Sequence, residues 1–426
     1  MNTDETDFIQ NINGFINKAR EQGLGQLVDE GERHDGTTVH IHGKDLKNFG
    51  SCGYMSLEFD PRVVEGGIDA IRKYGMQFST SRMFLSNPLY PILEELLEKI
   101  FQRPTLLAPT TTLAHLAALP TLIRSDDVVL MDQQVHSSVQ LTAKVLVANG
   151  VKVEIVPHSN VDRIERKIKA YKDIKKKIWY LGDGVYSMYG DCSPVAELME
   201  LLNKYEQFHL YLDDAHGTSW FGKNGRGYVL EKLPQHERLM LITGLAKGFG
   251  TGGGVITCPT PEIKQLIRNC GGPQTFSGPL QPPILGAAVA SAKIHLADGF
   301  LEMQNELRDR IHFCNQVLEK QPLPLLSSLD SPIRFLGVGS TEKAQAIVKL
   351  LMGDGYWLNI AQFPAVAPSH AGLRFMMNRK IRKADLESFV ESIKKAVSIV
   401  IGDDEESISQ IWKAFRKEYR YSLIPG

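Results

Sequence analysis

The stretch Leu210-Tyr211-Leu212-Asp213-Asp214-Ala215-His216-Gly217 shows the pattern on which the fold prediction depends: a short apolar run that ends in polar residues. Similar runs alternate with helical patterns along much of the chain, which predicts βαβ units and a mostly parallel sheet. The runs lie at 127–131, 152–156, 178–181, 210–212 and 239–243. Because ligands bind outside the carboxyl ends of the strands in such sheets, the residues just after each run form the candidate site.

The length of 426 residues favours two unequal domains that share a cleft. We expect residues 1–48 to form an N-terminal arm with an edge strand at 37–42, and residues 49–290 to form a large α/β domain. Residues 291–426 are expected to form a smaller C-terminal α+β domain with a helical tail. Its expected elements are strands at 333–337 and 356–360 and helices at 383–401 and 405–421.

Composition argues against several classes of partner. The chain has 48 Lys and Arg residues against 49 Asp and Glu, so its net charge of -1 provides no field for nucleic acid or an anionic membrane. Residues 1–15 are acidic and polar, unlike a signal peptide, and we expect a cytoplasmic protein without a membrane span. The five cysteines are odd in number and far apart, which indicates neither a disulfide framework nor a metal site.

The quoted stretch places a carboxylate, Asp213, at a strand end and an imidazole, His216, three residues later. A carboxylate beside a pyridine nitrogen keeps that ring protonated, and a histidine that donates to the ring's phenolate oxygen tunes its electronics. The spacing therefore fits pyridoxal 5'-phosphate (PLP). Taken alone, an Asp-Asp pair after a strand is as often the N-cap of a helix, and the motif leaves both readings open.

A second strand end carries Lys247 among small residues, in Gly244-Leu245-Ala246-Lys247-Gly248-Phe249-Gly250. A lysine in such a position can approach a bound aldehyde closely and carry it as a Schiff base. The glycines match neither the GxGxxG nor the GxxxxGK[ST] phosphate loop. A lone lysine in a glycine-rich loop is usually an exposed residue without a specific function. Here the upstream residues Asp213 and His216 favour the interpretation that Lys247 binds a cofactor.

Two more strand ends carry weaker signals. His136, in His136-Ser137-Ser138, follows a strand and could stack on a flat ring, although a loop histidine is the plainer reading. The glycine-rich turn at 183–191 contains Ser187 and could hold a polar group over a cofactor, although by itself it indicates only a turn.

In their order and spacing these motifs resemble those of the α-oxoamine synthase family of PLP-dependent enzymes, with bacterial serine palmitoyltransferases as the nearest group. The resemblance extends from about residue 49 to about residue 374. The motifs that carry it are 136–138, 184–188 with 190–191, 213–216, 221–227 and 245–250.

The resemblance implies fold type I, with a large, mostly parallel domain and a smaller C-terminal α+β domain, in a homodimer whose active sites lie at the subunit interface. It implies that Lys247 carries PLP, that Asp213 partners the pyridine nitrogen and that His216 contacts the phenolate oxygen. His136 would stack on the ring, and Arg374 would hold the amino-acid carboxylate. Further cofactor contacts are expected at Thr110, Thr111, Thr112, Ser187, Thr243 and, from the partner subunit, Ser277.

Several positions depart from the family pattern. Gly244 stands where relatives have a hydroxyl that binds phosphate, so that contact is lost or shifted. Three expected substrate-binding positions differ: Cys52 stands at an Asn or Tyr, Tyr90 at a His, and Gln362 at an extra arginine of serine palmitoyltransferases. His115 stands at an Asn. The residues expected to bind the cofactor match the family pattern, whereas those expected to bind the substrate differ from it. The sequence therefore indicates the class of reaction more firmly than the identity of the amino-acid substrate.

The implied reaction is a decarboxylative Claisen condensation of an α-amino acid with an acyl thioester, on CoA or an acyl carrier protein, to give an α-amino ketone such as a sphingoid or related lipid base. Another fold-type-I reaction, transamination or aldol cleavage, is an alternative that needs no thioester. A non-catalytic partner subunit is a third reading, against which the presence of Lys247 argues.

The predicted tail helix at 405–421 has apolar residues at helical spacing. We expect this stripe to face a core, which is the commoner meaning of the pattern, and a peripheral membrane contact is the alternative. The positions are Ile408, Ile411, Trp412, Phe415 and Tyr419.

Overall fold

The computed structural model describes residues 3–233, 235–327, 330–402 and 405–418. It divides into two compact units. The larger unit comprises Gly53–Ser187 and Cys192–Glu306, and the smaller unit comprises Met1–Cys52, Met188–Asp191 and Leu307–Gly426.

This division differs from the three parts expected from the sequence. The N-terminal residues belong to the smaller unit because β2 (Lys44–Asn48) pairs with β11 (Tyr356–Trp357) in a parallel ladder. The second boundary lies inside one continuous helix, α12 (Phe300–Leu318), rather than at residue 290.

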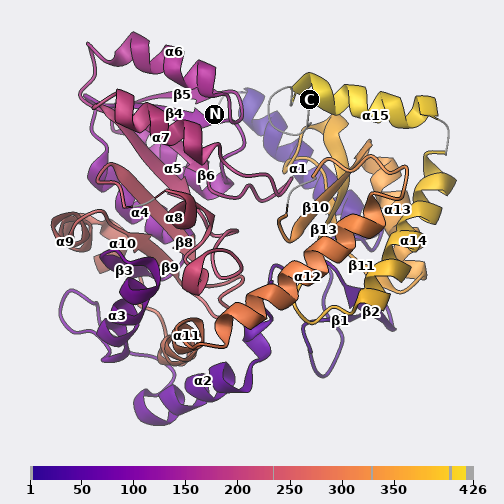
Figure 1. Ribbon diagram of the computed structural model, residues 1–426, viewed down its shortest axis with the longest axis horizontal. Coiled ribbons are helices and arrows are strands. Elements are labelled where there is room, and N and C mark those ends of the chain that lie inside the picture. Colours follow the sequence, from indigo (N-terminus) through magenta and orange to yellow (C-terminus); the bar gives the residue numbers. More distant parts are fainter. Residues whose placement is uncertain (1–2, 234, 328–329, 403–404, 419–426) are drawn as a thin grey trace. The chain divides into compact units, whose positions relative to one another are not determined.

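The larger unit is built on a seven-stranded sheet with the order β3-β9-β8-β7-β6-β4-β5 (Figure 1). Only β9 runs against its neighbours, and the prediction of a mostly parallel sheet is confirmed. The strands are β3 (Thr105–Ala108), β4 (Val128–Asp132), β5 (Lys152–Val156), β6 (Ile178–Asp183), β7 (Phe208–Asp213), β8 (Leu239–Gly244) and β9 (Gly254–Thr257). Five of them match the predicted runs to within two residues at each end, while β3 and β9 lie outside those runs.

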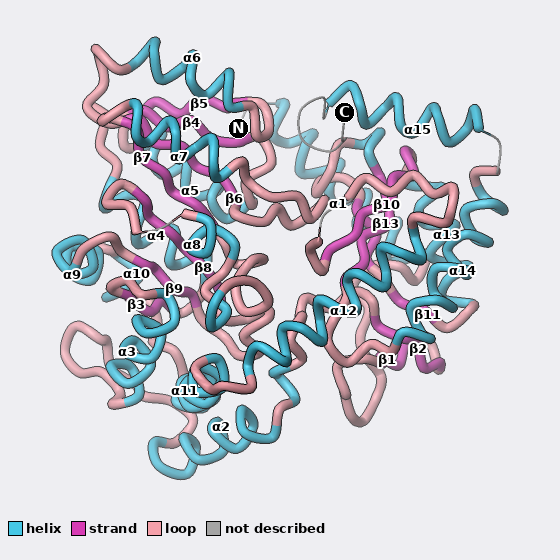
Figure 2. Tube along the Cα trace, viewed as in Figure 1, coloured by secondary structure: helices cyan, strands magenta, loops and turns pink. Residues whose placement is uncertain are grey.

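Helices cover both faces of this sheet (Figure 2) because successive strand residues point to opposite sides. In β4, for example, Val128 and Leu130 enter one core while Val129 and Met131 enter the other. The first core is closed by α3 (Leu89–Phe101), α6 (Val161–Tyr171), α7 (Val195–Lys204), α8 (Tyr228–Lys232) and α11 (Pro282–His295), and the second by α4 (Thr111–Leu122), α5 (Ser137–Ala148) and α9 (Pro261–Cys270). The remaining elements of this unit are η1 (Leu57–Phe59), α2 (Pro61–Tyr74), η2 (Lys223–Gly225) and α10 (Gly272–Phe276).

The smaller unit contains two three-stranded sheets, β1-β2-β11 and β10-β13-β12. The strand expected at 356–360 is two strands, because the chain leaves β11 at Leu358 and β12 then joins the other sheet. The strands not yet bounded are β1 (Thr38–Ile41), β10 (Ile333–Gly339), β12 (Asn359–Ala361) and β13 (Ala371–Met376). The helices are α1 (Thr3–Glu21), α13 (Thr341–Gly353), η3 (Pro368–His370), α14 (Lys383–Val400) and α15 (Glu405–Glu418).

The tail helix α15 directs its apolar stripe into the smaller unit. Ile411 and Phe415 are buried in a core with Phe335, and Trp412 packs against that core. The predicted positions Tyr419 and Tyr421 lie outside the described residues. Within the described part of the chain, no single helix has the length and apolar character of a membrane span; only α11 and α12 together pass that test, across a bend of 87°.

Candidate active site

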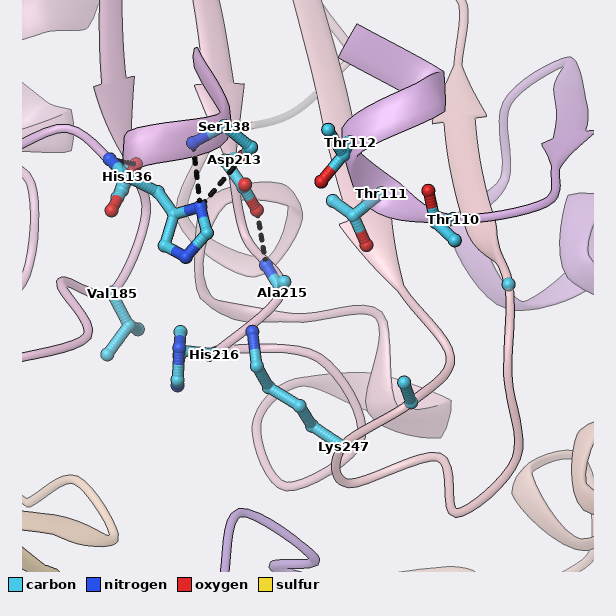
Figure 3. Close-up of a pocket in the computed structure, with 13 residues that line it drawn as sticks. Thr110, Thr111, Thr112, His136, Ser138, Val185, Asp213, Ala215, His216 and Lys247 are labelled. Atoms are coloured by element: carbon cyan, nitrogen blue, oxygen red, sulfur yellow. Dashed lines mark hydrogen bonds between the residues drawn. The ribbon is translucent and has the colours of Figure 1, made fainter. Parts of the chain in front are cut away.

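A cavity of about 320 Å³ lies at the carboxyl ends of the parallel strands in the larger unit (Figure 3). Small-molecule sites typically measure about 300–1,000 Å³. The cavity is lined by Thr110, Thr111, Thr112, His136, Ser138, Asp183, Val185, Asp213, Ala215, His216, Ala246, Lys247 and Gly253. The fold therefore brings together all four predicted catalytic residues and the three threonines.

Asp213 is the last residue of β7 and is almost fully buried. Its Oδ1 accepts the backbone N–H of Ala215 at 2.9 Å, and its Oδ2 contacts Nε2 of His115 at 3.0 Å. Burial alone would raise the pKa of this carboxyl, but the hydrogen bond from His115 and the nearby Lys247 more than offset it and lower the pKa to about 2. Asp213 is therefore expected to be a charged carboxylate near neutral pH, and it lines the cavity.

The neighbouring Asp214 has a different environment and does not line the cavity. Its Oδ2 accepts the backbone N–H of Val229 at 3.0 Å, and its carboxyl is surrounded by glycines. A Cβ added at Gly184, Gly217 or Gly227 would lie only 2.4, 2.1 or 2.3 Å from an Asp214 oxygen. Burial, with the charge of Asp213, raises the pKa of Asp214 to about 8. Residues 215–222 form turns and bends and no helix follows the Asp-Asp pair directly, so its N-cap reading is wrong.

Lys247 follows β8 in a loop that is closed by its own backbone hydrogen bonds. Leu245 N–H donates to Gly253 O at 2.9 Å, and Gly250 N–H donates to Lys247 O at 2.9 Å. Gly250 has a φ of 74°, and a Cβ there would lie 2.5 Å from the backbone N of Glu58, so glycine is required. The loop holds the lysine side chain in the cavity beside His216 (Figure 3).

His136 caps α5 and has a defined tautomer. Its Nδ1 accepts the backbone N–H of Ser138 at 3.3 Å and lies 2.7 Å from Oγ of the same residue, so Nε2 carries the proton. Burial lowers the pKa of His136, which makes a neutral imidazole the expected form near neutral pH. His216 is held by the hydroxyl of buried Tyr54, 2.7 Å from its Nδ1. Tyr54 was not predicted from the sequence.

The three threonines stand at the start of α4, where backbone N–H groups lack partners within the helix and favour an anion. Thr110 is the N-cap, and its Oγ1 accepts the N–H of Leu113 at 3.1 Å. A Cβ added at Gly244 would lie 2.6 Å from Oγ1 of Thr111. The departure at Gly244 is therefore explained: the Thr111 hydroxyl occupies the space that a side chain at 244 would need.

Three other predicted cofactor contacts do not line the cavity. The hydroxyl of Thr243 is turned away, toward Thr218 Oγ1 at 2.6 Å and the Asp214 carbonyl at 3.2 Å. It cannot replace the hydroxyl missing at 244. Ser187 is likewise not among the lining residues. Ser277 follows α10 in a partly exposed loop, where its Oγ lies 3.4 Å from Gly278 O.

Tyr90 is a core residue rather than part of the cavity wall. Its hydroxyl accepts the backbone N–H of Leu280 at 2.7 Å, and the Arg82 guanidinium lies 3.7 Å from the centre of its ring. These contacts give Tyr90 a packing role in this structure, and its contact with substrate stays a prediction.

The other predicted substrate residues belong to the smaller unit. Arg374 lies on β13, is buried, and directs Nη2 toward Sγ of Cys52 at 3.8 Å. Gln362 accepts a hydrogen bond from Gln345 at 3.3 Å. The structure thus brings Arg374 and Cys52 together.

Asp183 is a cavity residue that the sequence analysis did not single out. It ends β6 as Asp213 ends β7, and the two are directly paired in the ladder. The polar end of the 178–181 run was the available signal. Burial, and then the charge of Asp213, raise the pKa of Asp183 well above its usual range.

Comparison with known proteins agrees with this site. The profile of the family described as aminotransferase class I and II matches residues 57–393. An 8-amino-7-oxononanoate synthase from Dechloromonas aromatica is 30% identical over 367 residues, covering 84% of this chain and 92% of that protein. A serine palmitoyltransferase from Bacteroides thetaiotaomicron is 28% identical over 383 residues, covering 89% and 94%. A solved serine palmitoyltransferase from Sphingomonas wittichii has a TM-score of 0.84 at 21% identity, covering 92% and 98%.

The fold and the cavity define a PLP-dependent transferase of fold type I. The fold class predicted from the sequence is confirmed. Within that class, the chain belongs to the α-oxoamine synthase family, and its cofactor is PLP.

The chemical character of the residues that line the cavity fits this cofactor. Lys247 would supply the amine for the aldehyde, and the charged Asp213 would partner a protonated ring nitrogen. The start of α4, with the Thr111 hydroxyl, is suited to the phosphate, and the flat imidazole of His136 is suited to the ring face. We predict these roles for the individual residues.

Proposed function

We propose that the enzyme condenses an α-amino acid with an acyl thioester and releases carbon dioxide, giving an α-amino ketone. A proton leaves Cα, a C–C bond forms to the thioester carbonyl carbon, and the C–S bond breaks to release the thiol. The carboxylate is then lost as carbon dioxide, and a proton returns to Cα. The name 8-amino-7-oxononanoate synthase itself describes a product with adjacent amino and oxo groups, and serine palmitoyltransferase describes acyl transfer, which supports the proposal.

The observation that carries the proposal is the arrangement of Lys247, His136 and Asp213 around one cavity. When bound, PLP supplies an electron-withdrawing ring that stabilises negative charge at Cα. Asp213 keeps the ring nitrogen protonated, and the amine of Lys247 takes the Cα proton and later returns it. His136, with its proton on Nε2, donates a hydrogen bond to the thioester carbonyl oxygen as negative charge develops there.

Amino-acid recognition is assigned to Arg374. A guanidinium binds a carboxylate through two parallel charge-assisted hydrogen bonds, and burial strengthens them. Cys52, beside the Arg374 guanidinium, is the residue we assign to the edge of this carboxylate site. The thiol is smaller than the Asn or Tyr that the family resemblance implies at this position, so we expect it to leave more room for the amino-acid side chain.

For the acyl partner we propose a long-chain thioester and a sphingoid or related lipid base as the product. Purified enzyme with PLP should be incubated with glycine, alanine or serine and with acyl-CoA of short, dicarboxylic and long chains. Free thiol, carbon dioxide and amino ketone should appear in equal amounts, and the Lys247→Ala variant should release none. Amino-group transfer or C–C cleavage without thiol release would replace the condensation with aminotransferase or aldolase activity.

The products of this assay also distinguish between the activities for which the two relatives are named. A preference for serine with palmitoyl-CoA supports the sphingoid product, whereas alanine with a dicarboxylic acyl-CoA would support an oxononanoate-type product. Acyl carrier protein thioesters, assayed alongside, identify the carrier.

We also propose that the enzyme is a homodimer in which Ser277 reaches the partner's cofactor phosphate. Two neighbouring segments of the larger unit expose large apolar side chains: Met83, Phe84 and Leu85 lie in a loop, and Phe276, 90% exposed, is the last residue of α10. Ser81 Oγ donates to Thr275 O at 2.8 Å and joins the loop to α10. An apolar surface of this kind is usually buried in an interface. Light scattering should give twice the monomer mass, and Phe276→Glu should yield monomers that bind PLP weakly.

A further inference from the structure

We infer that His115, supported by Tyr211, is a positioning residue that places the negative charge of a buried carboxyl pair on Asp213 and leaves the proton on Asp183. The inference concerns cofactor binding, so it is independent of the substrates proposed above.

The geometry places His115 directly between two residues of β7. Tyr211 and Asp213 are two positions apart on that strand, so both side chains point to the face covered by α4. His115, on α4, is fully buried: its Nδ1 lies 2.8 Å from the Tyr211 hydroxyl, and its Nε2 lies 3.0 Å from Asp213 Oδ2. The three groups form a continuous hydrogen-bonded chain beneath the cavity.

The direction of these hydrogen bonds follows from the chemistry of their ends. The charged Asp213 carboxylate can only accept, so the proton of the imidazole is on Nε2. Burial, and then the charge of Asp213, raise the pKa of Tyr211 well above its usual value, so its hydroxyl keeps the proton it can donate. Tyr211 therefore donates to Nδ1, which leaves Nε2–H of His115 fixed on Asp213.

Asp183 and Asp213 compete for one negative charge. They face each other in the β6–β7 ladder, both are buried, and both line the cavity. Two adjacent buried carboxylates repel, so one of them retains a proton. Asp213 accepts N–H groups from Ala215 and His115, whereas Asp183 accepts the backbone N–H of His136 at 3.1 Å.

The other charged groups around the pair are Lys247, which faces both carboxyls, and Asp132 on β4, whose charge disfavours ionisation of Asp183. The imidazole of His136 also faces Asp213. With the charge on Asp213, the cavity presents a carboxylate for the ring nitrogen and a neutral carboxylic acid, Asp183, beside it. An Asn at 115, as in the family pattern, is too short to contact Asp213 and Tyr211 in the way the imidazole does.

The experiment compares PLP affinity and the visible absorbance of the bound cofactor in His115→Leu, His115→Asn and Tyr211→Phe. The matched control is His295→Leu, which removes another fully buried imidazole, bonded to Ser219 at 3.0 Å and lying outside the cavity lining. We expect His115→Leu to weaken PLP binding at least about tenfold, the equivalent of one pKa unit on Asp213, and to shift the cofactor band. His115→Asn should recover part of the loss, and Tyr211→Phe should show a smaller loss.

Adding Asp183→Asn tests the charge assignment itself. Because an amide cannot take the negative charge, we expect Asp183→Asn in the His115→Leu background to return the charge to Asp213 and restore at least half of the lost affinity on a logarithmic scale. If His115→Leu bound PLP with wild-type affinity and an unchanged band, or if Asp183→Asn gave no recovery, the inference would be overturned. Should His115→Leu fail to fold, Tyr211→Phe with and without Asp183→Asn makes the same comparison. All measurements use PLP without substrates, so they do not depend on the condensation activity.

Discussion

Gly244 and Thr111 should behave as a coupled pair. Replacing Gly244 with Thr places a Cβ 2.6 Å from Thr111 Oγ1, well inside normal contact distance, at a position that is buried in β8. Overpacking of this kind costs about 1–3 kcal/mol of unfolding free energy. Thr111→Gly alone costs less than about 1 kcal/mol in helix propensity. In the double variant Thr111→Gly/Gly244→Thr the clash is removed, so we expect a coupling energy of about 1–3 kcal/mol.

The same four proteins should differ in PLP affinity. Thr111→Gly removes the hydroxyl assigned to the phosphate, and a hydrogen bond to a charged group is worth about 1.5–3 kcal/mol, or about tenfold to a hundredfold in affinity. The double variant places a hydroxyl near the same position, carried by β8 instead of α4, and should recover most of this loss. Urea unfolding of the apo-enzyme measures stability, and absorbance titration of the apo-enzyme with PLP measures affinity.

A matched control is Gly272→Thr, because a Cβ at Gly272 meets no atom within 4 Å. We expect that substitution to change stability by less than about 0.5 kcal/mol. Two results would show that the two positions do not share one hydroxyl site. One is that Thr111→Gly and Gly244→Thr have additive effects on stability. The other is that the double variant binds PLP no better than Thr111→Gly.

Four further predictions address charged residues. Lys247→Ala should fold but lose both turnover and the borohydride-reducible link to PLP, as peptide mapping will show; a link to another lysine would contradict the assignment. Asp213→Asn should lower turnover by orders of magnitude while PLP still binds, although more weakly than in the wild type, and near-normal turnover would exclude the role given to its charge. Asp214 has a pKa of about 8 in the folded protein, whereas an unfolded Asp has a pKa of about 4. Its contribution to the free energy of unfolding is therefore fully present below about pH 4 and is lost as the pH rises through about 8. Asp214→Asn should flatten urea midpoints measured from pH 4 to 8, and an unchanged slope would refute this. Arg374→Lys should weaken amino-acid binding by about 1.5–3 kcal/mol, whereas Arg382→Lys, in an exposed ion pair with Asp385, should have little effect; equal small effects would remove Arg374 from the site.

Much of the site could be predicted from the sequence because parallel strands end at one edge of their sheet. Asp213, His216, His136 and Lys247 each follow an apolar run, and the fold brings all four to one cavity. The pattern of runs likewise predicted five of the seven strands of the larger sheet. These are local properties: period, strand length and the position of a polar residue after a strand are all visible in the sequence.

Contacts between residues distant in the sequence decided the remaining features. The sequence allows a hydroxyl at Thr243 or at Thr111 to replace the one missing at 244, and only the packing of β8 against α4 shows that Thr111 occupies that space. His115 acquires its role from two residues almost a hundred positions away, and only the structure shows that Tyr90 contacts Leu280 and Arg82. The sequence determined which side chains reach the carboxyl edge of the sheet. Only tertiary structure determined which neighbours they meet there, because hydrogen-bond partners, charge and free volume depend on elements that are far apart along the chain.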